Sequence, residues 1–301
     1  MTSRVDPLLA PARIHKHLAR SLKAQWKRCR KRLKRCQREF SEEAVHDVRV
    51  EIRRLLSGVE LLATFVHEDP IKQARKTLKR QLDSLAELRD TQVQRLGVAR
   101  LALLFPGARP FQDHLSQREK HSARQARRRI KEMKTARLGR LIDHFRDELR
   151  AHRQEGAGER DASALWRAVH RAFAEVARRR QLINPADTST IHRTRVAFKK
   201  FRYMVEVLAP LLPGVTEARL EAMHRYQGMM GDIQDAEVLL ESFDEFRQDH
   251  DPDPAASRAL RAEMLCRRQT HIQTYLRHSD QLCQFWPPRV PRSRKTKGKS
   301  A

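Results

Sequence analysis

Two helix-length stretches of the chain carry the side chains best suited to chemistry, and both show the same pattern of histidine followed by basic residues. The two rows are His46, Arg49 and Arg53 in the first stretch and His192, Arg195, Lys199 and Arg202 in the second. Residues three or four positions apart lie on one face of a helix. Imidazole and guanidinium groups donate hydrogen bonds to oxyanions, and arginine can do so bidentately. The rows therefore predict two helices that face one shared anionic ligand.

The same residues disfavour a metal site and give no sign of catalysis. Arginine neighbours repel a cation, and neither His46 nor His192 has a histidine or carboxylate three or four positions later to supply a second ligand. A lone histidine is more often a structural hydrogen-bonding residue, but the repetition of the whole row favours oxyanion binding. Protonated histidines would strengthen such binding at mildly acidic pH. No Walker loop, Gly-x-Ser-x-Gly elbow or His-Glu-x-x-His motif occurs, so we assign no catalytic residue, metal ligand or cofactor.

An apolar row borders each basic row and predicts which side of each helix is buried. At 100° per residue, these rows form one stripe on each helix. They consist of Val45, Val48, Ile52, Leu55, Val59 and Leu62 in the first copy and Ile191, Phe198, Phe201, Val205 and Leu208 in the second. A buried row beside a basic row would fix the direction in which the basic side chains point.

Acidic residues recur in matching places in the two halves of the sequence. Glu60 and Glu206 lie one or two turns beyond the basic rows, where we expect them to pair with basic side chains and hold them extended. Asp90 and Asp235 are 235 − 90 = 145 residues apart, nearly the 192 − 46 = 146 residues that separate His46 from His192. We interpret the two aspartates as salt-bridge partners that orient the basic rows from a neighbouring helix, and the alternative is a divalent ion bridging carboxylate and phosphate.

The duplicated pattern resembles that of a known family. The stretches 45–62 and 191–208 are similar to the His-x-x-Arg-Val-x-x-[Arg/Lys]-[Arg/Lys] signature of the CHAD domain, the conserved-histidine α-helical domain. Each is followed by a stretch similar to the second signature of that family, Glu87-Leu88-Arg89-Asp90 and Gly231-Asp232-Ile233-Gln234-Asp235. The resemblance covers roughly residues 10 to 286. It implies an all-α fold of two antiparallel four-helix bundles and binding of inorganic polyphosphate. The acidic strand motif of the triphosphate tunnel enzymes that often accompany CHAD domains is absent, so the resemblance implies no hydrolytic activity.

Composition agrees with a basic, helical protein of about two domains. The 301 residues include 40% apolar and only 6% aromatic residues, with 10 glycines, which favours helix over sheet. The net charge of +26 should attract polyanions, with nucleic acid, polyphosphate and anionic membrane surfaces as candidates. No segment approaches the roughly 20 apolar residues of a membrane span, and the first residues lack a signal-peptide core. We therefore expect a soluble, cytoplasmic protein.

The four cysteines lie at positions of the apolar stripes and form no Cys-x-x-Cys pair. We expect Cys29, Cys36, Cys266 and Cys283 to be buried free thiols in a reducing compartment.

Helix start and stop signals divide the chain into two similar halves. Residues 1–154 should form the first four-helix half, 155–286 the second, and 287–301 a disordered basic tail. In the first half we expect helices from Pro11 to Glu39, from Ser41 to about His67, from Asp69 to Pro106, and from Pro110 to about Arg150. Residues 154–163 read as a linker. In the second half we expect helices to begin at Asp187, Thr216 and Pro252.

Further basic residues could extend an anion track. The first helix of each half supplies Arg20, Lys23 and Lys27 or Arg167 and Arg171, although a solvated basic face is an equally good interpretation for the helix of residues 11–39. Arg54 and Lys200 point about a quarter-turn outward and are secondary candidates.

Three functions fit the sequence. The first is non-catalytic binding of inorganic polyphosphate, with the protein associated with polyphosphate granules. The second is nucleic-acid binding through the positive charge and the basic tail at 294–299, although no recognition module is evident and few aromatic residues are available for stacking. The third is an enzyme acting on polyphosphate through Asp90 or Asp235 with Mg²⁺. The oligomeric state, monomer or homodimer, stays open.

Overall fold

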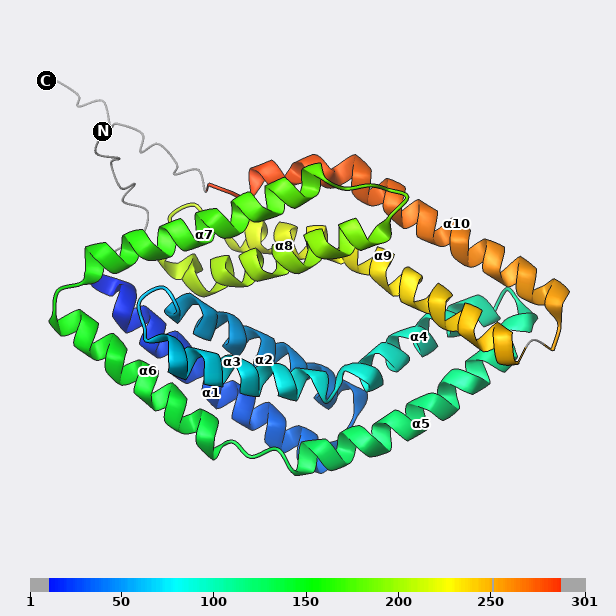
Figure 1. Cartoon of the computed structure of the whole chain (residues 1–301), viewed down its shortest axis with the longest axis horizontal. Coiled ribbons are helices and arrows are strands. Elements are labelled where there is room, and N and C mark those ends of the chain that lie inside the picture. The colour runs from blue at the N-terminus through cyan, green and yellow to red at the C-terminus, as the bar shows by residue number, and fades with distance from the viewer. Residues whose placement is uncertain (1–10, 251, 288–301) are drawn as a thin grey trace, which may run out of the picture.

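The computed structural model of the chain describes residues 11–250 and 252–287 and confirms the all-α prediction for them. This part contains ten α-helices, four short 3-10 helices and no strand beyond an isolated bridge between Asn184 and Asp187 (Figure 1). The α-helices are α1 (Ile14–Glu39), α2 (Glu42–Leu62), α3 (Glu68–Asp83), α4 (Ala86–Ala102), α5 (Arg109–Lys131), α6 (Ala136–Gln154), α7 (Gly158–Gln181), α8 (Thr188–Leu208), α9 (Glu217–Asp249) and α10 (Pro254–His278). The 3-10 helices are η1 (Pro11–Arg13), η2 (Pro106–Ala108), η3 (Ala209–Leu211) and η4 (Ser279–Gln284). All of the predicted basic tail at 287–301 except Pro287 lies outside the described residues.

Side-chain caps fix the start of the two signature helices. Ser41 precedes α2 and accepts a hydrogen bond from the Ala44 amide at 3.2 Å, and Asp187 precedes α8 and accepts one from the Ser189 amide at 3.0 Å. Thr216 and Asp253 cap α9 and α10 in the same way. Each cap satisfies an amide that would lack a partner in the first turn. The predicted helix starts at these four places are confirmed.

Two helices expected to be continuous in the first half are each broken in two. Residues 69–106 form α3 and α4, separated at Ser84 and Leu85, and residues 110–150 form α5 and α6, separated at 132–135. Ser84 turns its hydroxyl back to the Gln81 carbonyl at 2.8 Å, which competes with continued helical bonding. In the second half, α9 runs unbroken for 33 residues.

The expected linker at 154–163 is much shorter in the structure. Helix α6 continues to Gln154 and α7 begins at Gly158, so only three residues connect them. Gly156 makes the turn with a positive φ of 70°. A Cβ at Gly158 would lie 2.8 Å from the Pro11 carbonyl oxygen, so glycine there permits close approach of the segment before α1.

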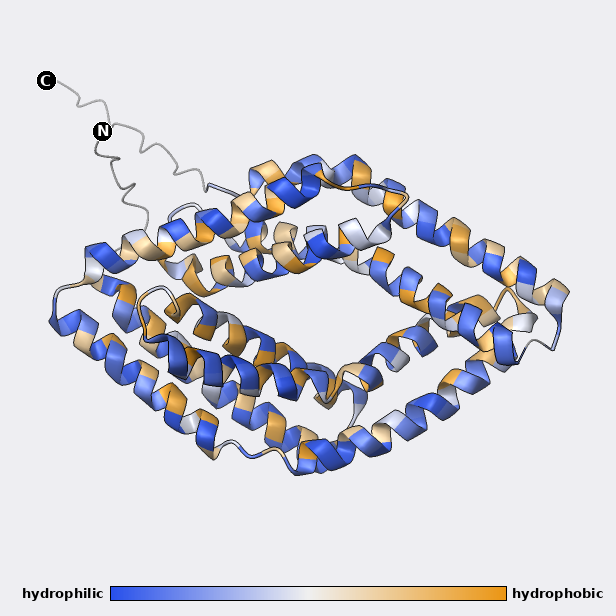
Figure 2. Cartoon of the chain, viewed as in Figure 1, coloured by the Kyte–Doolittle hydropathy of each residue, from blue (hydrophilic) through white to orange (hydrophobic). Residues whose placement is uncertain are grey.

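The buried side chains do not separate into one core per half. The larger cluster joins residues of α1, α2, α3 and α6 to residues of α7, α8 and the first part of α9. The smaller cluster joins Val98, Phe111 and Leu115 of the first half to Phe243 and Leu260 of the second. Hydrophobic residues recur at intervals along the helices (Figure 2). Both predicted apolar stripes, on α2 and α8, are fully buried.

The prediction of four buried thiols is wrong for two of them. Cys29 and Cys36 are buried on α1, and burial raises the pKa of the Cys29 thiol to about 12. Cys266 and Cys283 are exposed. Helix α10 packs mainly along α9, so it buries only a narrow row that includes Leu260, Met264 and Ile272 and misses Cys266. Cys283 lies in the 3-10 helix η4, where the 3.6-residue period does not apply.

Candidate anion-binding site

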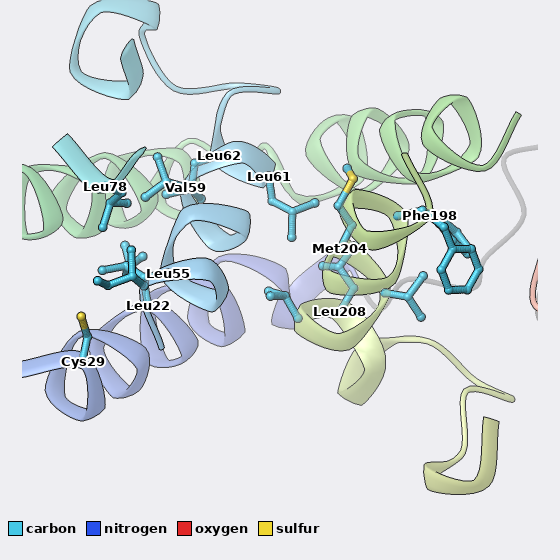
Figure 3. Close-up of a cluster of buried hydrophobic side chains, with 14 of the residues drawn as sticks. Leu22, Cys29, Leu55, Val59, Leu61, Leu62, Leu78, Phe198, Met204 and Leu208 are labelled. Atoms are coloured by element: carbon cyan, nitrogen blue, oxygen red, sulfur yellow. The ribbon is translucent and has the colours of Figure 1, made fainter. Parts of the chain in front are cut away.

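The two signature helices pack directly against each other, although they belong to different halves of the sequence. Helix α2 contacts α8. Leu61 of α2 is buried and points toward Met204 of α8, with Leu208 close by (Figure 3). Because each basic row borders its apolar row, this packing turns part of each basic row toward the other helix.

Arg53 of α2 and Arg195 and Lys199 of α8 occupy one shared space. Burial lowers the pKa of Lys199, and the positive charges of Arg53, Arg195, Arg49 and Arg202 lower it further, to about 7. Burial also lowers the pKa of Arg53, to which the charge of Arg195 contributes. These mutual effects require the side chains to lie close together. We call Arg49, Arg53, Arg195 and Lys199 the central cluster.

Three members of the central cluster have no bonding partner within the described part of the chain. Arg53, Arg195 and Lys199 form no hydrogen bond or ion pair there, and the Nε of Arg195 is buried without an acceptor. All three residues are half-buried, and a cation held partly out of water without a partner is costly. Several such cations together make a site that an anion would stabilise.

Arg49 is the member of the cluster that the protein itself holds in place. Its side chain is 6% exposed, and its Nη1 donates a hydrogen bond to the Leu82 carbonyl at 3.0 Å. That carbonyl is near the end of α3, next to the break before α4. Burial, with the charge of Arg53, lowers the pKa of Arg49 to about 10. The break in the helix thus supplies an acceptor that orients Arg49.

The aspartates expected to form salt bridges with the basic rows do not do so. Asp90 and Asp235 form no direct ion pair among the described residues. Burial raises the pKa of both carboxyl groups, against the opposing influence of Arg49 on Asp90 and of Arg195 on Asp235. Both residues are exposed, and Asp235 lines a cavity together with Arg89 and Asp232. Asp90 and Asp235 reduce the positive potential of the cluster without neutralising its side chains.

Arg89 is a member of this site whose role the sequence analysis did not assign. Its charge acts on His46, Arg49, Arg53, Asp90 and Asp235, so it lies between the basic and acidic groups. It also pairs with Glu42 at 3.4 Å. Its position inside the Glu87–Asp90 signature was the signal that could have identified it.

The histidines lie at the edge of the cluster. His46 is exposed, and its pKa is lowered by the surrounding protein, with a further contribution from Arg89 and an opposing one from Asp47. His192 is exposed near the start of α8. The charges of Arg53 and Arg49 act on His46, so His46 lies beside the cluster.

Arg202 is close to the cluster but bonded to other side chains. Its Nε donates to the Gln227 amide oxygen at 2.9 Å, and its Nη1 donates to the Glu206 carboxylate. The expected pairing of Glu206 with the basic row is therefore present. Glu60, in contrast, lies 3.7 Å from Arg75 and does not pair with the row.

The remaining predicted residues are all exposed. Arg54 is exposed and pairs with Glu51 at 3.0 Å, and Lys200 is exposed. Arg167 and Arg171 are exposed on α7. Arg20, Lys23 and Lys27 line cavities between α1 and α6 instead.

One group of side chains has the composition of a metal site, which the sequence analysis did not identify. Both His15 Nε2 and His152 Nδ1 lie 2.8 Å from Asp161 Oδ2, where α1, α6 and α7 meet. Arg160 contacts the other carboxylate oxygen at 3.3 Å. Burial alone would raise the pKa of Asp161, but these three hydrogen bonds lower it. The neighbouring cavity is lined by six basic side chains, which repel a cation, so the group fits a structural hydrogen-bond network better than a metal.

The chain resembles known proteins in its sequence and in its fold. A family model described as the CHAD domain matches residues 17–244. No curated protein matches the sequence. The crystal structure of the CHAD domain from the plant Ricinus communis has a TM-score of 0.70 at 16% identity, covering 97% of this chain and 99% of that chain. PptA from Streptomyces chartreusis has a TM-score of 0.64 at 17% identity, covering 90% and 99%. These structural likenesses show a shared fold.

Proposed function

We propose, from the premise that this chain belongs to the CHAD domain family, that it binds inorganic polyphosphate without catalysing a reaction. The observation that supports this function is the central cluster, in which Arg53, Arg195 and Lys199 converge from two helices and form no hydrogen bond or ion pair with any described residue. A bound phosphate chain would supply the acceptors that these donors lack.

Inorganic polyphosphate fits the cluster better than other polyanions do. It carries a negative charge on each phosphoryl unit and offers no base for stacking. The site supplies closely spaced guanidinium and ammonium donors, which form strong charge-assisted bonds with phosphate oxygens. The ring of Tyr203, a residue that acts electrostatically on Arg53, is buried, and its centre lies 4.4 Å from the Arg202 guanidinium. Stacking of nucleic-acid bases would need an exposed ring.

We assign the ligand-binding roles to the central cluster first. Arg53, Arg195 and Lys199 would contact phosphate directly, and Arg49 would do so from the orientation set by Leu82. His46 and His192 would contribute at the edge when protonated, and Arg202 would act mainly by positioning. Asp90 and Asp235 could hold a divalent ion between carboxylate and phosphate.

The same proposal includes an internal duplication of the chain. Residues 1–154 and 155–286 would be two four-helix halves that arose by internal duplication, with α2 equivalent to α8. The duplication would place equivalent basic rows on both sides of one ligand. We further propose that the protein works in the cytoplasm at polyphosphate granules. Among the described residues, no helix combines the length and apolar character needed to span a bilayer.

Substitution of the central cluster tests the proposal. Arg53→Gln and Lys199→Met should each weaken polyphosphate binding by about 1.5–3 kcal/mol, roughly tenfold to a hundredfold, measured by calorimetry at fixed salt. The adjacent Arg54→Gln and Lys200→Met remove equal charge from exposed positions and should change the affinity by no more than about threefold. Equal losses in both pairs would contradict a localised site.

Competition separates the proposed function from the alternatives. Long-chain polyphosphate should displace bound DNA at equal charge concentration, and failure to do so would favour a nucleic-acid-binding protein. Release of orthophosphate from polyphosphate in the presence of Mg²⁺ would favour the enzyme hypothesis.

A further inference from the structure

A continuous basic groove follows the seam between α1 and α6, separate from the central cluster. It consists of two adjoining cavities of about 860 Å³ and 250 Å³ that share Lys23 and Arg146 as lining residues. Its lining residues belong to α1 and α6, whereas the central cluster lies on α2 and α8. We call this surface the α1–α6 groove.

The groove presents an almost unbroken row of cations. Helix α1 supplies Lys16, Arg20, Lys23, Lys27, Arg30, Lys31, Lys34 and Arg38, and α6 supplies Arg146, Arg150 and Arg153. The only carboxylate in the lining is Asp143, which already pairs with Arg146 at 3.0 Å. At 1.5 Å per residue, the row along α1 is about 33 Å long.

The other face of α1 shows that this excess of charge is specific to the groove. The arginines of α1 that face α2 are paired, since Arg28 contacts Glu51 and Arg32 contacts Asp47. Arg35 pairs with Glu39 and Glu43. The five lysines of the groove form no hydrogen bond or ion pair among the described residues. The same helix therefore carries one neutralised face and one face open to an anion.

The floor of the groove explains which polyanion fits it. Trp26 is half-buried between the helices, and the position of Gly139 on α6 lies against its indole ring. The Arg30 guanidinium lies 5.9 Å from the centre of the same ring. Among the described residues that line the groove, Trp26 is the only tryptophan, tyrosine or phenylalanine. Because this single ring is half-buried, the groove offers charge and length with little surface on which successive bases could stack, which favours polyphosphate over nucleic acid.

We infer that the α1–α6 groove is a second binding site for inorganic polyphosphate, which long chains occupy together with the central cluster. This inference rests on the proposed function, because it assumes that the central cluster holds part of the same ligand. A chain bound at one site is at high effective concentration for the other, so occupation of both raises the affinity without new contacts at either. Short chains reach only one site and gain nothing.

Chain length is the variable that tests this inference. The groove variant carries Lys23→Gln, Lys27→Gln and Lys34→Gln together, and a control variant carries Lys76→Gln, Lys79→Gln and Lys120→Gln, which removes equal charge from exposed positions outside the described cavities. We expect the groove variant to lose at least tenfold in affinity for long-chain polyphosphate and less than about threefold for triphosphate. The control should lose less than about threefold for both. Equal behaviour of the two variants toward long chains would overturn the inference.

Fluorescence of Trp26 gives a direct readout of groove occupation. In a variant with Trp166→Phe and Trp286→Phe, Trp26 is the single remaining tryptophan. Long-chain polyphosphate should change its emission, and triphosphate at saturation of the central cluster should not. An unchanged emission with saturating long chains would contradict occupation of the groove.

The two proposals can fail separately. If Lys199→Met leaves binding of both chain lengths intact while the groove variant abolishes it, the central site is wrong and the groove alone binds. If Lys199→Met weakens both lengths and the groove variant matches its control, the central site stands and the groove inference fails.

Discussion

At the scale of a single residue, the positive charges around Lys199 couple ligand binding to proton uptake. Burial, and then the charges of Arg53, Arg195, Arg49 and Arg202, lower the pKa of Lys199 to about 7, whereas an unperturbed lysine titrates near pH 10.4. At pH 8 most of the free protein therefore carries a neutral amine at this position. A bound phosphate favours the charged form and raises the pKa again.

Polyphosphate binding at pH 8 should therefore take up close to one proton at Lys199, and affinity should fall as pH rises through 7. Calorimetry in buffers of different ionisation enthalpy measures this uptake. His46, whose pKa is lowered, adds a second uptake only at more acidic pH. In Lys199→Met the uptake at pH 8 should disappear. Uptake that persists in this variant, or affinity that rises with pH, would be inconsistent with a charged Lys199 contacting phosphate.

At the scale of elements, α2 and α8 position their arginines in the cluster through different neighbours. Arg49 is oriented by the Leu82 carbonyl beside the break between α3 and α4. Arg195 lies against the unbroken α9, where a Cβ on Gly231 would be 3.7 Å from its Nε and Nη2. A small residue on α9 therefore leaves the space that the Arg195 side chain occupies.

Enlarging Gly231 should displace Arg195. Gly231→Leu is expected to weaken polyphosphate binding about tenfold, the loss of one charge-assisted contact. Gly231→Ala, which makes only ordinary van der Waals contact, should bind like wild type. Gly228→Leu is the matched control, because a Cβ at Gly228 meets no atom within 4 Å. Affinity measured by calorimetry, with circular dichroism to confirm folding, decides between them; an unimpaired Gly231→Leu would show that Arg195 is not a ligand.

The sequence predicted the helices and the buried faces better than it predicted the surroundings of each charge. The stripes of α2 and α8 and the cap at Ser41 follow from local rules of period and hydrogen bonding, and all are confirmed. The break at Ser84 was missed because neither glycine nor proline marks it. Asp90 was expected to form a salt bridge, but its distance from the arginines depends on how α4 packs, which local sequence does not determine. Arg20, Lys23 and Lys27 were grouped with the central rows, and only packing against α6 shows that they line another surface.

At the scale of the whole molecule, buried side chains of residues 1–154 and of residues 155–286 pack together in common clusters. Val98 and Phe111 of the first half pack with Phe243 and Leu260 of the second, and the larger cluster also crosses between halves. Such interlocking holds α2 against α8 and so keeps the cluster together despite its internal repulsion.

Residues 1–154 alone should therefore fail to fold cooperatively. Separation would expose the apolar faces of α2, α4 and α5 that the second half covers. The free energy lost with this burial exceeds the net free energy of unfolding of a typical domain. Thermal melting followed by circular dichroism should show a broad transition, against a sharp one for the full chain. A sharp, independent transition of the fragment would indicate self-sufficient halves.

A crystal structure of the full chain with bound triphosphate is the most direct measurement of the central claim. The phosphate groups should lie between α2 and α8, with oxygens within hydrogen-bonding distance of Arg53, Arg195 and Lys199. Triphosphate bound only elsewhere on the surface, with the central cluster empty, would contradict the account.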